Sequence, residues 1–412
     1  MVFLIGAVGV EFFHRQILPV ALVPLGTELA LSDTQSGMLI SAFALAYAVA
    51  AFAVGRAADR GNRRNVYALG IAVWSVATAA GAACGGFLSF FATRLLVGVG
   101  QAASGACNGP LIADYVRPER RSGAMGLVAV AAAIGVVAAL VAGGFATERF
   151  GWRAAFAGAG IAGLVFALAF VWVVQEPARG WSEGRSHEPG DRPALGEVLR
   201  TLGSIPALRH VLFGAVLANT ALLAGAQWGP AFFMRVHHLG LADAGAAGGA
   251  AALLAVGGGV AGGVIADRAW ARDRKAVLRI PAACFALAFP LSYAAFLWPG
   301  TLGSLALLIT SVGLAMVHNA PVGAAVQALA PLRTRALASG LFNAVLTLVS
   351  LGGGPLLTGW ISDRFGDGTE GSGLARALAW SSLLYLGAAL HFFLAARSFA
   401  SDLERSRAYQ EG

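Results

Sequence analysis

The sequence predicts an all-α integral membrane protein with twelve transmembrane helices, arranged as two six-helix repeats. Charged residues make up only 12% of the 412 residues, whereas 58% are hydrophobic. A single water-soluble core of this size could not bury so much apolar surface. The apolar residues fall into runs of about 20 or more, the length that spans a bilayer. In addition, four short motifs recur in the same order in the two halves of the chain.

Each predicted helix corresponds to one apolar run. The runs are 2–27, 35–57, 65–84, 87–114, 123–146, 153–175, 208–233, 241–266, 277–298, 301–330, 336–360 and 375–396. No basic region or small-residue cleavage site marks the first run, so we expect a span there rather than a signal peptide. The predicted divisions are an N-terminal six-helix bundle (1–175), a cytoplasmic linker (176–207), a C-terminal six-helix bundle (208–396) and a cytoplasmic tail (397–412).

The basic residues predict the orientation. They cluster in connections on one side, at 56–64, 117–121, 179–209, 268–279, 333–335 and 397–407, whereas Arg149, Arg153, Arg235, Arg364 and Arg376 lie on the other side. Because cytoplasmic loops carry an excess of Lys and Arg, we expect both termini in the cytoplasm. The net charge of +8 then reflects topology and lipid headgroups, and we expect no nucleic-acid partner.

Motifs for catalysis, metals or nucleotides are absent from the sequence. The only lysine, Lys275, precedes alanine, so there is no Gly-Lys-Ser/Thr loop for ATP, and the HExxH and GxSxG patterns do not occur. The three cysteines, Cys84, Cys107 and Cys284, form no CxxC pattern and are expected to be packing residues. We therefore expect no enzymatic activity, no cofactor and no metal.

The internal repeat has a slowly growing offset. Gly55-x-x-x-Asp59-Arg60 recurs as Gly263-x-x-x-Asp267-Arg268, Asn108-x-Pro110 as Asn319-x-Pro321, Arg121-x-x-Ala124-x-Gly126 as Arg335-x-x-Ala338-x-Gly340, and Gly144–Gly151 as Gly359–Gly366. Four matches in order predict a parallel repeat about an axis along the membrane normal.

The first motif predicts a cytosolic gate. A glycine permits close helix approach, and a carboxylate can accept hydrogen bonds at the N-terminus of a neighbouring helix. The candidate gating residues are Gly55, Asp59, Arg60, Arg63, Arg64, Gly263, Asp267 and Arg268. The alternative is a basic loop that only follows the topology rule.

Further motifs carry a resemblance to a known family. They are HRQIL (14–18), LSDTQSGML (31–39), GRAADRGNRRN (55–65), RLLVGVGQAA (94–103), LIADYVRPERR (111–121), GWRAAF (151–156) and EPARG (176–180). With the repeat, they resemble the major facilitator superfamily, and within it the bacterial Spinster-like branch. The resemblance covers essentially the whole chain and implies secondary transport by alternating access across the bacterial inner membrane. Studied members of the branch resemble transporters of lysolipids or sphingolipids.

Two carboxylates of the branch pattern are replaced in this chain. The branch has Asp-Arg where this chain has His14-Arg15, and GxGE where it has Gly98-Val-Gly100-Gln101. The resemblance links both carboxylates to proton coupling. Because this chain lacks both, the resemblance alone does not imply that its transport is coupled to protons.

Charged residues inside spans are candidate functional residues because burying them in a bilayer is costly. Glu11, His14 and Arg15 are expected on one face of the first span, with Arg15 binding an anion and Glu11 and His14 titrating as a coupled pair. The alternative is an ion pair between Glu11 and Arg15 that only orders this span. Arg94 and Gln101 lie on a polar stripe of the fourth span with Asn108; Gln101 is expected to face His14, and Arg94 to bind substrate or to hold neighbouring carbonyls.

The second half contributes uncharged candidates. They are Asn219, Gln227, Asn319 and Asn343, near His318, Gln327 and Thr347. By the repeat offset Asn219 corresponds to Glu11, so the second half is expected to contribute hydrogen bonds and apolar contacts. His318 alone is more typical of helix packing.

Together these features predict a monomeric secondary transporter. Its substrate is expected to be a small organic or amphipathic anion, of which a lysolipid is one example, moved together with protons. An uncoupled facilitator, and a receptor or sensor on the same fold, are the alternatives.

Overall fold

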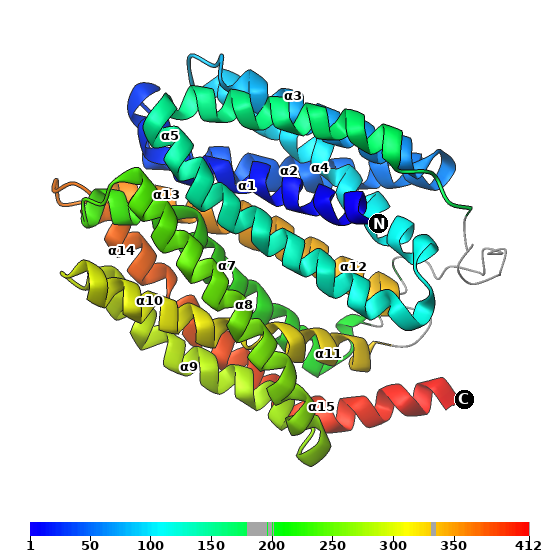
Figure 1. The fold of residues 1–412 in the computed structure, drawn as a ribbon. Helices are drawn as coiled ribbons and strands as arrows, with labels where there is room; N and C mark the ends of the chain where they lie inside the picture. The colour runs from blue at the N-terminus through cyan, green and yellow to red at the C-terminus, as the bar shows by residue number, and fades with distance from the viewer. Residues whose placement is uncertain (179–195, 197–199, 201, 331–334, 412) are drawn as a thin grey trace. The chain divides into compact units, whose positions relative to one another are not determined.

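The computed structural model describes residues 1–178, 202–330 and 335–411 and the single positions 196 and 200. The described elements are all helical: α1 (Val2–Glu28), α2 (Asp33–Arg60), α3 (Arg63–Gly81), α4 (Phe87–Tyr115), η1 (Pro118–Arg120), α5 (Arg121–Val173), α7 (Pro206–Val236), α8 (Leu241–Arg272), α9 (Ala276–Leu297), α10 (Thr301–Met316), α11 (Asn319–Leu329), α12 (Arg335–Val345), η4 (Leu346–Leu351), α13 (Gly352–Phe365), α14 (Ser372–Ser381) and α15 (Leu384–Glu411) (Figure 1). Ten helical stretches of this part of the chain are long and apolar enough to cross a membrane. The predicted fold class is confirmed.

The twelve apolar runs map onto these helices with local breaks. The continuous α5 contains two runs, which separate at Gly151, where φ is 83° and ψ is 156°. Only glycine adopts this left-handed conformation readily, so the sequence places the bend between the fifth and sixth spans there. The tenth span is divided into α10 and α11, and the eleventh into α12, the π-helical η4 and α13.

The described chain forms two compact units. The first contains residues 1–178 together with Gln227–Ala252 and Pro355–Asp363, and the second contains residues 202–226, Leu253–Gly354 and the chain from Arg364 onward. The first unit therefore includes the end of α7, the start of α8 and most of α13. The predicted linker 176–207 lies largely outside the described residues, as does Arg333.

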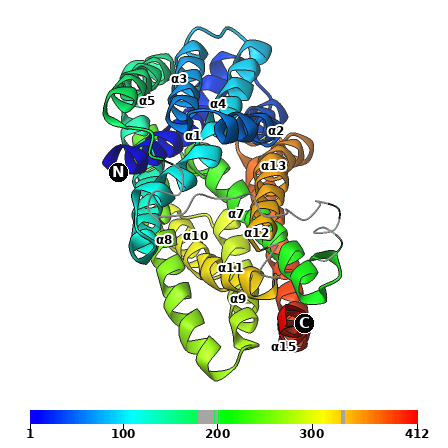
Figure 2. The ribbon, with the colours of Figure 1, turned by 90° about the vertical axis from the view of Figure 1, so that its right-hand side faces the viewer.

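The first unit is held together by helix pairs with aromatic side chains between them. In this unit α1 packs on α5, α2 on α4, and α3 on both α4 and α5 (Figure 2). Phe90, Trp152 and Phe156 contact one another edge to face with ring centroids 5.5 to 6.0 Å apart. Edge-to-face contact is the favoured aromatic geometry, and here it fixes the start of α4 against the part of α5 that follows Gly151.

The second unit packs around α9, which contacts α10, α14 and α15. Phe285 of α9 stacks on Phe392 of α15 with centroids 5.8 Å apart. The predicted tail continues α15 as a helix, and Phe399 is buried in the same core. Asp402 Oδ2 accepts a hydrogen bond from the backbone amide of Ala207 at 2.8 Å, which satisfies a free donor at the start of α7.

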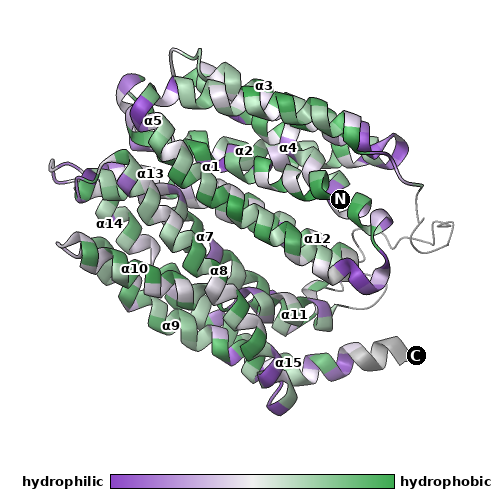
Figure 3. Cartoon of the chain, viewed as in Figure 1, coloured by the Kyte–Doolittle hydropathy of each residue, from purple (hydrophilic) through white to green (hydrophobic). Residues whose placement is uncertain are grey.

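The surface composition fits a bilayer. Polar residues gather at helix ends and connections, whereas the helix bodies are apolar (Figure 3). Large apolar side chains such as Phe52, Leu88 and Trp172 are 74%, 78% and 87% exposed. Such exposure is costly in water and favourable in lipid.

Candidate functional site

A cluster of charged and amide side chains lies inside the first unit, between α1 and α4. Arg15 Nη2 donates to Glu11 Oε1 at 2.6 Å, the ion pair that the four-residue spacing predicts. Arg15 Nε and Nη2 also donate to Gln101 Oε1 at 3.3 and 3.1 Å. Gln101 Nε2 in turn donates to the backbone carbonyl of Glu11 at 3.1 Å. Gln101 therefore bridges both members of the ion pair.

Three further side chains contact this ion pair, and a fourth supports one of them. Ser104 Oγ donates to Glu11 Oε2 at 2.5 Å, and the Tyr67 hydroxyl lies 3.1 Å from Ser104 Oγ. The guanidinium of Arg15 lies 4.7 Å from the ring centre of Phe12 and 4.5 Å from that of Phe43, within the range of cation–π attraction. The position of Arg15 is thus set from three sides.

His14 does not join this cluster, contrary to the expectation that it faces Gln101. Its Nδ1 lies 3.1 Å from Thr78 Oγ1 of α3, and its Nε2 packs against Gly163 of α5, where an added Cβ atom would lie 2.9 Å away. The reason is helical geometry: His14 is displaced from Glu11 by about 60° around α1 and Arg15 by about 40° in the opposite sense. Gln101 instead contacts Arg15 and Glu11.

The partners of His14 determine which of its two ring nitrogens carries a hydrogen. Thr78 Oγ1 donates its only hydrogen to the carbonyl of Trp74 at 2.8 Å. Because that hydroxyl has no second hydrogen, His14 Nδ1 must be the donor in its contact with Thr78.

Arg94 is another cation of the first unit, and it is more deeply buried than Arg15. It is 2% exposed, and it interacts electrostatically with His14 and Arg15. Its Nε and Nη1 make no hydrogen bond to the described residues. The neighbouring carbonyls, predicted as alternative partners of Arg94, therefore do not satisfy these two donors.

The candidate residues of the second half divide between the two units. Asn219, Asn319 and Asn343 line one cavity of about 290 Å³ in the second unit, together with His318 and Gln327. Gln227 lies elsewhere: it belongs to the first unit, where its Nε2 donates to Gln16 Oε1 of α1 at 3.1 Å.

The residues of the predicted cytosolic gate have different environments. Arg63 is buried and binds Asp114 at 2.6 Å and Glu176 at 2.8 Å. Asp59 and Asp267 are exposed and make no hydrogen bond or ion pair to the described chain. Arg63 therefore joins the starts of α3 and the linker to the end of α4, while the two repeated aspartates stay unpaired in this conformation.

The remaining gate candidates lie at the ends of α2 and α8 and at the start of α3. A Cβ atom at Gly55 would have no neighbour within 4 Å, and one at Gly263 would lie 3.8 Å from Ala320 Cβ. Neither glycine is therefore in close helix contact in this conformation. Arg64 donates to Asn65 Oδ1 at 2.8 Å, and Arg60 and Arg268 are exposed.

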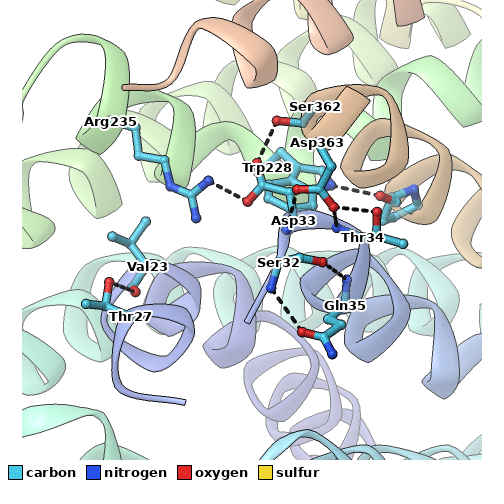
Figure 4. A network of polar contacts seen from close by, with 11 residues as sticks. Val23, Thr27, Ser32, Asp33, Thr34, Gln35, Trp228, Arg235, Ser362 and Asp363 are labelled. Carbon is cyan, nitrogen blue, oxygen red and sulfur yellow. Dashed lines mark hydrogen bonds and ion pairs between the residues drawn. The ribbon is translucent and has the colours of Figure 1, made fainter. Parts of the chain in front are cut away.

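At the opposite end of α2, a polar network connects α2, α7 and α13 (Figure 4). Asp363 accepts hydrogen bonds from the backbone amides of Asp33 and Thr34 at 2.9 and 2.7 Å. Asp33 in turn binds Arg235 Nη1 at 2.6 Å and accepts from Ser362 Oγ at 2.6 Å. We refer to these five residues as the Asp33–Asp363 network.

Most of this network is not predicted by the sequence. Asp33 and Thr34 lie in the LSDTQSGML motif, and Ser32 of that motif caps α2 by accepting from the amide of Gln35. That capping signal predicts a helix start but does not identify its long-range partners. For the other side, the available signal is that Asp363 lies in Gly359–Gly366, the repeat of Gly144–Gly151.

Twelve apolar segments, an internal repeat and charged side chains buried between helices define a polytopic helical membrane protein of the transporter type. The family model described as Major Facilitator Superfamily matches residues 4–354. An MFS-type efflux pump of Mycolicibacterium smegmatis is 30% identical over 98% of this chain and 94% of its own length. The chain belongs to the major facilitator superfamily.

Two further comparisons refine the relationship. A probable L-galactonate transporter of Escherichia coli is 28% identical over 52% of this chain and 45% of its own length. A bacterial homologue of the human lysosomal transporter Spinster, in an inward-facing and unoccupied conformation, has a TM-score of 0.88 with 24% identity and covers 97% of each chain. The predicted resemblance to Spinster-like proteins is thus confirmed at the level of the fold.

Proposed function

We propose that the protein is a secondary transporter that moves a small organic anion across the bacterial inner membrane, without enzymatic activity and as a monomer. Two six-helix bundles, 1–175 and 208–396, would alternate access to a central site. The termini would lie in the cytoplasm. Proton coupling is part of this proposal, and an uncoupled facilitator is its alternative.

The proposed negative charge of the substrate rests on one observation: the guanidinium of Arg94 is buried, and its Nε and Nη1 have no hydrogen-bond partner among the described residues. Glu11 neutralises Arg15, and this leaves Arg94 as the excess positive charge of the cluster. A buried cation with two free donors is costly in a bilayer, and a bound carboxylate or phosphate would offset that cost. The relatives support the same class of substrate, because the similar Escherichia coli protein is named for an organic acid.

The Asp33–Asp363 network supports the proposed alternating access. It joins the ends of α2, α7 and α13 on the side opposite the basic loops, while Asp59 and Asp267 at the basic side are unpaired within the described chain. This arrangement is the one expected of a transporter closed at its outer end.

Binding and uptake by the purified protein test the proposal. Thermal-shift screening against lysolipids, aromatic acids, sugar acids and dicarboxylates identifies ligands, because a ligand of the folded state stabilises it. We expect Arg94→Met and Arg15→Ala to lose both the thermal shift and uptake into proteoliposomes, whereas Arg149→Ala, an exposed arginine, retains both. Uptake at the wild-type level by Arg94→Met would exclude Arg94 from the site, and a preference for neutral ligands would contradict the proposal.

A further inference from the structure

Two histidines face each other across the contact between α7 and α15 in the second unit. His210 Nδ1 lies 3.0 Å from His391 Nδ1, and the ring centroids are 5.2 Å apart with 46° between the ring planes. The ring of Phe213 packs against that of His391 with centroids 5.6 Å apart and limits its rotation. The two histidines are 181 positions apart in the chain, so no motif spacing predicts this pair.

Close packing of α7 against α15 holds the two histidines in place. A Cβ atom at Gly214, one turn after the first histidine, would lie 3.1 Å from the ring of Phe392. A Cβ atom at Gly387, one turn before the second histidine, would lie 2.9 Å from the side chain of Leu217. The two glycines therefore let the helices approach closely on either side of the pair.

Ions from the water phase can reach the pair. Both histidines are half-buried, so neither ring is sealed inside the core. His210 lies about 6 Å along the helix axis from Pro206, the first residue of α7. An ion therefore reaches the two rings without crossing the apolar length of the helix.

Two imidazole nitrogens at this distance require a hydrogen or a metal ion between them, because two lone pairs that face each other repel. With a hydrogen, one ring carries it on Nδ1 and the other ring accepts. With a metal ion, both rings carry their hydrogen on Nε2, and both Nδ1 lone pairs bind the ion. The second state requires only that one neutral ring moves its hydrogen from Nδ1 to Nε2. Neither Nε2 makes a hydrogen bond to the described chain that this change would break.

The distance between the two Nδ1 atoms fits a metal site. Imidazole nitrogens bind first-row metals at about 2.0–2.1 Å, so two nitrogens 3.0 Å apart subtend an angle of roughly 95° at the metal. That angle is close to the right angle of neighbouring ligands in octahedral and square-planar complexes. A tetrahedral ion would need the nitrogens only about 0.3 Å further apart.

The donor atoms select the class of ion. Neutral imidazole suits late first-row transition metals such as Ni²⁺ and Cu²⁺, whereas Mg²⁺ and Ca²⁺ prefer oxygen ligands. Among the described residues, no group of three or more His, Cys, Asp or Glu side chains is placed to hold a metal ion. Water molecules would therefore fill the other coordination positions of an ion bound by this pair.

We infer that His210 and His391 bind one late first-row transition-metal ion, such as Ni²⁺ or Cu²⁺, through both Nδ1 atoms. The ion joins α7 to α15 and stabilises the second unit, because the two ligands come together only in the folded chain. This inference goes beyond the proposed function and does not depend on it, since both histidines belong to the second unit and the charged cluster to the first.

Metal titration of the purified full-length protein, with any affinity tag removed, tests the inference. Ni²⁺ should raise the melting temperature of the wild-type protein, because a ligand of the folded state stabilises it, and Mg²⁺ should not. His210→Gln and His391→Gln should each weaken Ni²⁺ binding, measured by calorimetry, by at least about tenfold, the lower end of the range for outer partners of metal ligands. His238→Gln, at an exposed histidine of the first unit, is the control and should bind Ni²⁺ as the wild type does.

A second measurement does not require any variant to fold. Cu²⁺ bound to the wild-type protein should give an electron paramagnetic resonance spectrum with couplings to two imidazoles. Couplings to fewer than two imidazoles, or equal Ni²⁺ affinity in the wild type and both glutamine variants, overturn the inference. A wild-type protein that binds no Ni²⁺, while both glutamine variants melt at a lower temperature, also overturns it and assigns the pair to a shared hydrogen bond.

Discussion

Asp363 at the end of α13 accepts hydrogen bonds from both the backbone amide and the hydroxyl of Thr34, at 2.7 and 2.5 Å. The repeat provides a counterpart, because Glu148 of α5 accepts from the backbone amide of Ala242 at 2.6 Å. Glu148 and Asp363 are repeat-related, 215 positions apart, and each binds the first turn of a helix, α2 or α8. A carboxylate is favoured there because the free amides and the helix dipole give the N-terminus a partial positive charge.

These two carboxylates should hold the closed end of the first unit. We expect Asp363→Asn and Glu148→Gln each to weaken it by about 1.5–3 kcal/mol, the range for a hydrogen bond to a charged group. Hydrogen–deuterium exchange of segments 33–37 and 241–245 measures the effect, and exchange should become faster in both variants. Glu370→Gln, an exposed carboxylate of the α13–α14 connection, serves as the control. Unchanged exchange in both test variants would show that the contacts contribute nothing to closure.

The close approach of the α2 backbone to Gly359 should stabilise this end of the first unit as much as the charged contacts do. A Cβ atom at this position would overlap the backbone carbonyl of Asp33, whereas Gly353 of the same helix has no atom within 4 Å of its Cβ position. We expect Gly359→Ala to lower the melting temperature and to open this end, at a cost of about 1–3 kcal/mol, while Gly353→Ala has little effect. Equal melting temperatures and equal exchange in the two variants would contradict close packing here.

Features that depend on neighbouring positions in the chain were predictable. The apolar runs predicted the spans, since span length is set by the bilayer and not by the partner helices. The pair of Glu11 and Arg15 followed from their four-residue spacing on one helix. The gap between the runs 123–146 and 153–175 also predicted a break, and the structure places it at Gly151.

Features that depend on which helix lies behind a side chain were not predictable. His14 and Arg15 are neighbours in sequence, yet one contacts Thr78 of α3 and the other Gln101 of α4. The contact between Thr34 and Asp363 joins residues 329 positions apart. Spacing along one helix indicates which residues share a face, and only the packing of helices determines what that face contacts.

The repeated aspartates of the cytosolic gate should act in the other conformation. Asp59 and Asp267 are exposed and unpaired within the described chain, so Asp59→Asn and Asp267→Asn should leave the melting temperature of this state unchanged. If they bind helix ends when the cytosolic side closes, both variants should disfavour that closed state. Labelling of a cysteine near the cytosolic end of α2, in a background without the three native cysteines, should then become faster. Labelling at the wild-type rate in both variants, as in the control Glu119→Gln, would argue against a gating role.

Proton coupling should depend mainly on His14. Glu11 already accepts hydrogen bonds from Arg15 and Ser104 through both carboxylate oxygens, and protonation would weaken these contacts. His14 Nδ1 donates to the Thr78 hydroxyl, whose own hydrogen is bound to a carbonyl, so Nε2 is the nitrogen that would carry a second proton. Gln101, which replaces the carboxylate of the branch pattern, cannot titrate.

We therefore expect His14→Ala to lose substrate accumulation driven by an imposed pH gradient in proteoliposomes, while it still equilibrates substrate across the membrane. Glu11→Gln should keep the response to the gradient and bind the anionic substrate more tightly, because Glu11 then no longer neutralises Arg15. His210→Ala, a histidine of the second unit, is the control and should accumulate substrate normally. Accumulation that survives in the double variant Glu11→Gln, His14→Ala would exclude both residues as proton carriers. If the wild-type protein itself only equilibrates its substrate, the protein is a facilitator, and the replacement of the two branch carboxylates by His14 and Gln101 provides the chemical reason.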